Sequence, residues 1–105
     1  LSELTEKEWL DMRYVVRRME SCFKSVLGAT MCNWSCLMNS FYKESPANPH
    51  LHLHVRPRFK SPIVINGNQY MDEEFGHHYD RNQNSKITPE DRQTLYEWMK
   101  NNLKV

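Results

Sequence analysis

The segment from Pro49 to Arg58 alternates polar and apolar residues at every position from 50 to 56. Alternation with a period of two is typical of a β-strand, whose successive side chains point to opposite faces of a sheet. The apolar positions are Leu51, Leu53 and Val55. They predict one face packed on a core, which requires a second layer of structure to cover it. The polar positions predict an opposite face that is turned to solvent.

Three of the polar positions are histidines, His50, His52 and His54, and Arg56 follows on the same face. Packing alone gives no reason for all three positions to be histidine. Imidazole titrates near neutral pH and serves as a nucleophile, a hydrogen-bond partner or a metal ligand. Neighbouring histidines on one strand face lie about 6.6 Å apart at Cα, and the outer two about 13 Å apart. The segment therefore predicts phosphoryl and proton chemistry or, with a further ligand from elsewhere, a zinc site.

The motif His50-x-His52-x-His54, with apolar residues between the histidines, resembles the signature of the histidine triad (HIT) family of nucleotide hydrolases and transferases. The likeness extends upstream, because the segment 32–39 is similar to the strand that precedes the triad in such proteins. Asn39 lies eleven positions before His50, where the family places an amide side chain that touches the phosphate.

The stretch from Thr5 through the triad to Gly76-His77-His78-Tyr79-Asp80 is similar to a microbial branch of HIT proteins. Arg56 departs from the motif, since the family usually has its last hydrophobic residue at this position. HIT domains also carry several strands before their first long helix, whereas this chain opens at the helix. We therefore expect residues 1–105 to form a single HIT-like domain that lacks the N-terminal part, or about its C-terminal two-thirds to three-quarters.

The resemblance implies a role for each site residue. His52 would be the nucleophile that attacks the α-phosphorus of a nucleotide, giving a nucleotidyl-histidine that water then cleaves. The family orients this ring through a hydrogen bond to the backbone carbonyl of the first histidine. His54 and His50 would bind phosphate oxygens and assist the leaving group, while Asn39 donates to the phosphoryl oxygens. No metal and no cofactor is expected.

The expected function is therefore that of a cytoplasmic nucleotide hydrolase or nucleotidyl transferase, which acts on dinucleoside polyphosphates or nucleoside phosphoramidates. A nucleotide-binding HIT-like protein without turnover and a zinc-binding module are the alternatives. Because absent front strands would leave a sheet edge uncovered, we expect a homodimer, as HIT proteins commonly form, or a companion segment.

Composition limits the other partners. Fourteen Lys and Arg against thirteen Asp and Glu nearly balance, which argues against a nucleic acid or an anionic membrane held by bulk electrostatics. No apolar run approaches the roughly 20 residues of a membrane span.

The three cysteines are an odd number without the dense spacing of a secreted disulfide framework. We interpret Cys22, Cys32 and Cys36 as buried reduced thiols, with a zinc site shared with the histidines as the alternative.

The rest of the chain predicts two helices and further strands. A capping box from Thr5 to Glu8 begins a helix, and Gly28 ends it. Apolar residues recur between them at spacings of three and four and predict a core-facing stripe: Trp9, Met12, Val16, Met19, Phe23, Val26 and Leu27.

The segment 31–39 returns to a period of two. Paired antiparallel with the histidine strand, it would turn an apolar face to the first helix and a polar face to the substrate. Asn33 and Asn39 would lie on that polar face beside the histidines, and we take Asn33, Asn39 and Arg56 as the phosphate- or substrate-binding residues. The expected fold is thus α+β, an antiparallel sheet packed on a long helix, with a C-terminal helix.

The dipeptide Asn66-Gly67 predicts a tight hairpin turn within the run 62–71, which we place at the edge of the main sheet. A second helix begins after the capping hydroxyl of Thr88, with the carboxylate of Asp91 near its positive end.

Several further residues admit two interpretations. His77 and His78 line the pocket or a subunit contact, or else belong to a polar loop. Arg56 and Arg58 steer phosphates, or else are surface residues at the end of a strand. The tryptophans are interpreted as core residues: Trp9, Trp34 and Trp98.

Overall fold

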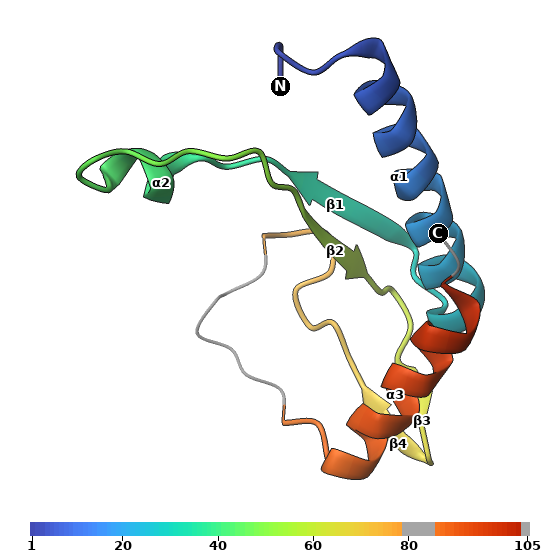
Figure 1. Ribbon diagram of the computed structural model, residues 1–105. Helices are drawn as coiled ribbons and strands as arrows, with labels where there is room; N and C mark the ends of the chain where they lie inside the picture. Colours follow the sequence, from blue (N-terminus) through green and yellow to red (C-terminus); the bar gives the residue numbers. More distant parts are fainter. Residues whose placement is uncertain (79–85, 104–105) are drawn as a thin grey trace.

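The computed structural model describes residues 1–78 and 86–103. It is a mixed α+β fold with two small antiparallel sheets, one long helix and a C-terminal helix (Figure 1). The α+β class predicted from the sequence is confirmed, while the HIT-like arrangement stays a prediction. Tyr79 and Asp80, which belong to the stretch that resembles the family, lie outside the described residues. None of the described helices combines the length and apolar character that a membrane span requires.

The long helix α1 (Glu6–Leu27) has the ends that the sequence predicts. The Thr5 hydroxyl accepts from the Glu8 backbone N–H at 3.2 Å, and the Thr5 backbone N–H donates to Glu8 Oε2 at 2.7 Å. Gly28 ends the helix in the left-handed conformation, with φ of 73°. The predicted stripe is half-buried except for Trp9, which is 43% exposed. The prediction that Trp9 is a core residue is therefore wrong in this structure.

The first sheet pairs β1 (Met31–Ser35) with β2 (His54–Arg58) in antiparallel register. Trp34 lies opposite Val55, and its indole Nε1 donates to Glu20 Oε1 of α1 at 2.9 Å. This contact shows that the apolar face of the sheet is turned to α1, as the alternation predicts. The polar residues of the same strands occupy the opposite face.

Both strands are shorter than the sequence predicts. The chain leaves β1 after Ser35 and forms the short helix α2 (Asn39–Lys43), so β2 has a ladder partner only from His54 onward. Figure 1 shows the intervening residues as an arm that projects away from α1 and α3, with α2 near its tip. None of the described helices and strands packs over the apolar side of this arm, so Leu51 and Leu53 are 39% and 37% exposed instead of packed on the core.

The second sheet is a separate hairpin of β3 (Ile63–Ile65) and β4 (Asn68–Tyr70). Asn66 and Gly67 both have positive φ, 50° and 82°, which is the turn that the Asn-Gly pair predicts. The hairpin was expected at the edge of the main sheet, and that placement is wrong. It packs instead on α3 (Pro89–Asn102), and the side chain of Ile65 is fully buried.

A buried carboxylate joins this hairpin to α3. Asp91, 1% exposed, accepts from Asn66 Nδ2 at 2.9 Å and Asn68 Nδ2 at 2.8 Å, and also from the hydroxyl of Tyr70. These hydrogen bonds, that from Tyr70 above all, lower the pKa of Asp91. Three side chains of the hairpin therefore satisfy one charge in the first turn of α3, which fixes the two elements to each other.

Candidate functional site

The three histidines lie on one side of the arm and of the start of β2. The ring centroids of His50 and His52 are 5.3 Å apart, and those of His52 and His54 are also 5.3 Å apart. His52 is half-buried, while His50 and His54 are exposed. Only His54 belongs to β2. The prediction that all three lie on one regular strand is wrong, because residues 50–53 pair with no strand among the residues that the structure describes. The extended arm nevertheless keeps the three imidazoles together in contact with solvent.

The middle ring is oriented by the backbone of the first histidine. His52 Nδ1 lies 3.2 Å from the carbonyl oxygen of His50. A carbonyl oxygen only accepts, so this contact selects the tautomer in which Nδ1 holds the proton. In the neutral ring Nε2 then bears the lone pair. This hydrogen bond is the one that the family resemblance implies.

The short helix α2 supports the histidines through Phe41. The Phe41 ring meets the ring of His50 at 4.2 Å and that of His52 at 5.0 Å between centroids, both edge-on. No sequence pattern indicates this contact, since a single aromatic residue in a polar connection is not distinctive. Asn39, predicted to lie on a strand, is instead the first residue of α2 and is exposed. It lies two residues before Phe41. Asn39 is not part of a strand because β1 ends at Ser35.

Beyond His54, the polar face continues along the paired part of the sheet. The register sets Asn33 opposite Arg56, and Ser35 opposite His54. Directly opposed residues share a face, so Asn33, Ser35 and Arg56 continue this face beyond the three histidines. Arg56 is half-buried, and its Nη1 lies 3.4 Å from Ser35 Oγ. The structure thus brings together Asn33, Arg56 and His54, as predicted.

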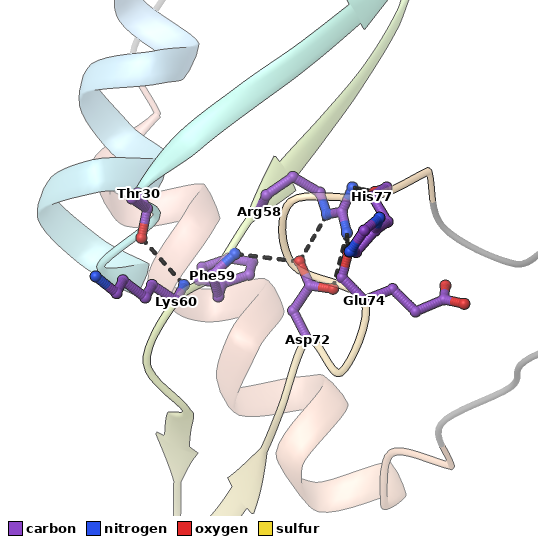
Figure 2. A network of polar contacts seen from close by, with 7 residues as sticks. All are labelled: Thr30, Arg58, Phe59, Lys60, Asp72, Glu74 and His77. Atoms are coloured by element: carbon purple, nitrogen blue, oxygen red, sulfur yellow. Dashed lines mark hydrogen bonds and ion pairs between the residues drawn. The ribbon is translucent and has the colours of Figure 1, made fainter.

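Arg58, the last residue of β2, has a different role from the phosphate steering considered above. It is 3% exposed, and it donates from Nε to Asp72 Oδ2 at 2.6 Å and from Nη2 to Asp72 Oδ1 at 3.1 Å. Its guanidinium also donates to the carbonyl oxygens of Glu74 at 2.6 Å and His77 at 2.5 Å (Figure 2). The hydrogen bond from Arg58 lowers the pKa of Asp72. Arg58 is therefore a buried clamp that holds the loop 72–77 against the polar face of the sheet.

The clamp brings His78 to the site. A cleft of about 670 Å³ is lined by residues from both faces of β1, by Leu37, by two arginines of β2 and by His78: Cys32, Asn33, Trp34, Ser35, Leu37, Arg56, Arg58 and His78. His77 and His78 also border a smaller hollow beside Met31 and Asn33. The geometry therefore supports the interpretation of His78 as a pocket-lining residue. What brings His78 to the pocket is the long-range pairing of Arg58 with Asp72.

The three cysteines are free thiols, as predicted, but only Cys22 is buried, while Cys32 and Cys36 are half-buried. Burial raises the pKa of the Cys22 thiol, and it is also the main cause of the raised pKa of Cys32. Within residues 1–78 and 86–103, no three His, Cys, Asp or Glu side chains are grouped in a way that would hold a metal ion. The zinc alternative therefore gains no geometric support from this part of the chain.

Comparison of the chain with models of known protein families, with curated protein sequences and with solved structures found no match. The resemblance to the histidine triad family accordingly depends on the motif residues and on the arrangement described above.

Proposed function

We propose that this chain is a nucleotide hydrolase or nucleotidyl transferase that cleaves at the α-phosphate through a nucleotidyl-histidine intermediate. Its substrates would be dinucleoside polyphosphates or nucleoside phosphoramidates. The observation that carries the proposal is the hydrogen bond between His52 Nδ1 and the carbonyl oxygen of His50. It leaves Nε2 of a half-buried, solvent-accessible ring as the atom available for attack.

The reaction divides into two displacements at phosphorus. In the first, the Nε2 lone pair of His52 forms a bond to the α-phosphorus, and the bond from phosphorus to the leaving oxygen or nitrogen breaks. The leaving group takes up a proton as it departs. In the second, water attacks the same phosphorus, releases His52 and loses a proton, giving the nucleoside monophosphate. A covalent intermediate replaces one difficult step by two easier ones.

The neighbouring groups fit the charge that develops during these steps. His50 and His54 flank the nucleophile at equal centroid distances of 5.3 Å, where each would bind phosphoryl oxygens and one would protonate the leaving group. Asn33 and Arg56 lie further along the same face, where they would bind the substrate's phosphates. Asn39, at the start of α2, would donate its amide to the phosphoryl oxygens as the resemblance implies.

The test is incubation with a labelled nucleoside phosphoramidate, followed by mass spectrometry of the quenched protein. We expect a nucleotide-mass adduct on His52 and turnover to the monophosphate. His52→Ala should abolish the adduct and lower turnover by orders of magnitude. His77→Ala is the matched control, since this histidine is exposed and its backbone alone meets Arg58. Turnover that survives in His52→Ala would refute the assigned nucleophile, and binding without any adduct would favour the non-catalytic alternative.

We also propose that the chain forms a homodimer or pairs with a companion segment. Large apolar side chains are exposed on the N-terminal half of α1: Trp9, Leu10, Tyr14 and Val15 are 43%, 64%, 51% and 38% exposed. Large exposed apolar side chains gathered on one helix are consistent with an interface. Sedimentation equilibrium of the purified chain should therefore give the mass of two copies. A monomer at all concentrations would exclude the dimer.

A further inference from the structure

We infer that two copies of this chain pair along the outer edge of β2, in an antiparallel ladder centred on Leu53, and that each copy thereby places a histidine beside His52 of the other. The inference rests on the proposed homodimer and deepens it. It names the edge at which the copies meet, and it gives the partner copy a place in the candidate site.

The edge of β2 that faces away from β1 is open. Just beyond β2, the Lys60 backbone N–H donates to Thr30 Oγ1, on the side of β1, at 3.1 Å. The Phe59 backbone N–H points the other way and donates to Asp72 Oδ2 at 3.2 Å (Figure 2). Because N–H groups alternate in direction along an extended chain, the odd-numbered residues turn their backbone groups away from β1. In the described part of the chain no strand pairs with β2 on that side, so the edge offers donors and acceptors to another chain.

The spacing of two prolines makes this edge complementary to itself. Pro49 and Pro57 lie four positions to either side of Leu53. When two copies pair antiparallel about Leu53, residues 51, 53 and 55 of each copy exchange N–H and C=O groups with residues 55, 53 and 51 of the other. Both prolines, which lack an N–H, then fall outside the ladder. A shift by two residues would bring a proline into it, in a pair that has only one hydrogen bond.

The apolar side of the arm gains a cover in this register. Leu51 and Leu53 are 39% and 37% exposed. Each Leu51 would lie opposite the partner's Val55, and the two Leu53 side chains would lie opposite each other. Residues 50–55 also contain no Asp, Glu, Lys or Arg, the charged residues that commonly protect an exposed edge. A two-fold pairing of identical segments uses each edge once, so it gives a closed dimer.

A hollow beside the same edge accommodates the continuation of the partner chain. It has a volume of about 410 Å³ and is lined by residues 55–59, by Ile63 and by residues 70–72, most of which have apolar side chains. The register carries the partner's Pro49 and then the partner's Ala47 past this part of β2. Small apolar residues suit such a lining, so the hollow and the ladder indicate the same occupant.

The opposite side of the ladder brings two rows of histidines together. In the same register His52 lies opposite the partner's His54, in a pair that shares no backbone hydrogen bond. The Cα atoms of such a pair are about 4.5 Å apart. Each candidate nucleophile would therefore have an imidazole of the other copy beside it, in addition to His50 and His54 of its own chain. The partner would supply a further group that binds phosphoryl oxygens or protonates the leaving group.

Disulfide trapping tests the register. Leu53→Cys places two thiols opposite each other at a Cα separation of about 5.5 Å, which a disulfide accepts. Leu51→Cys is the matched control, because Leu51 is similarly exposed but would lie about 13 Å from the partner's Leu51 along the strand. Each variant is mildly oxidised, digested and analysed by mass spectrometry without reduction, which distinguishes the new bridge from bridges of the native cysteines. We expect a bridge between two copies at position 53 and none at position 51.

Bridges of equal abundance at positions 53 and 51, or no bridge at position 53, would overturn the inference. Leu10→Cys distinguishes this dimer from one that meets through α1, where Leu10 is 64% exposed. A bridge at position 10 in place of one at position 53 would assign the homodimer to α1 and would also overturn the pairing of β2.

A charge at the centre of the ladder tests the same edge in solution. Leu53→Lys places two like charges directly opposite each other, whereas Val64→Lys adds the same charge at an exposed position of β3. Sedimentation equilibrium should show the dissociation constant of the dimer raised about tenfold or more by Leu53→Lys and unchanged by Val64→Lys. Equal constants for the two variants would contradict the inference. Neither experiment depends on turnover, so failure to form the His52 adduct would refute the proposed function and leave the pairing of β2 intact.

Discussion

Arg58 and Asp72 meet through two parallel hydrogen bonds, from Nε to Oδ2 at 2.6 Å and from Nη2 to Oδ1 at 3.1 Å. Asp72 Oδ2 also accepts from the Phe59 backbone N–H at 3.2 Å. Each side chain is almost enclosed, with 4% of Arg58 and 16% of Asp72 exposed. The pair fixes the end of β2 to the loop that leads to His78, and so joins the stability of the fold to the shape of the candidate site.

Arg58→Ala should therefore lower the stability of the chain. Removing Arg58 leaves the Asp72 carboxylate without its charged partner and two loop carbonyls without their donor, at a cost of about 3 kcal/mol. The free energy of unfolding from urea titration measures this loss. The exposed Arg13→Ala provides the control and should change that free energy by no more than about 0.5 kcal/mol. Similar losses for both variants would show that the clamp contributes nothing particular.

The same pair makes the free energy of unfolding depend on pH. Arg58 lowers the pKa of Asp72 in the folded chain, so the native state binds this proton less tightly than the unfolded chain. The contribution is present above the unfolded pKa, about 4, and is lost as the pH falls through the lower folded value. Asp91, whose pKa is lowered by its hydrogen bond from Tyr70, acts in the same direction.

Urea titrations from about pH 6 to about pH 2 test this dependence. Asp72→Asn should be less stable than wild type at the upper end, yet lose less stability below about pH 4. If the free energy of unfolding changes with pH equally steeply for both proteins in that range, Asp72 is not the titrating group.

Phe41→Ala should weaken the reaction without unfolding the chain. The Phe41 ring contacts both His50 and His52 at the arm. Without it, His52, the proposed nucleophile, is less firmly oriented, and we expect kcat/KM of the proposed reaction to fall about tenfold. Tyr42→Ala is the neighbouring control, because Tyr42 is 64% exposed. The ring-proton resonances of His50 and His52 should move only in Phe41→Ala. Equal effects of the two variants on both readouts would refute the supporting role of Phe41.

Gly28→Ala tests the end of α1. A Cβ at this position meets nothing within 4 Å, so only the backbone conformation, with φ of 73°, opposes the substitution. We expect a loss of about 1 kcal/mol in the free energy of unfolding. Gly28→Asn should lose less, because asparagine tolerates the left-handed conformation. An alanine variant as stable as wild type would mean that the helix ends differently.

Local structure was largely predictable from the sequence. The Thr5 capping box, the Gly28 stop and the Asn66-Gly67 turn each depend on residues within a few positions of one another, and all three are present in the structure. The alternation of β1 and β2 also predicted which face of the paired strands is polar. Strand length was not predictable, because β2 is a strand only where β1 supplies its partner.

Part of the candidate site was predictable for the same reason. The period of two placed His50, His52 and His54 together, and the resemblance implied the hydrogen bond from His52 to the His50 carbonyl. The contacts of Phe41 and the approach of His78 were not predictable, because each depends on segments that meet only in three dimensions.

The sequence by itself determined the helix ends, the hairpin turn and the single-sided row of histidines, since backbone preferences and side-chain alternation act over short spans. Only the tertiary structure decided that Arg58 is a buried clamp and that Asp91 joins α3 to the hairpin. The identity of a charged residue does not tell whether its side chain is exposed or buried. What distinguishes the two is whether partners far along the chain, here Asp72 and Tyr70, come close enough to satisfy its hydrogen bonds.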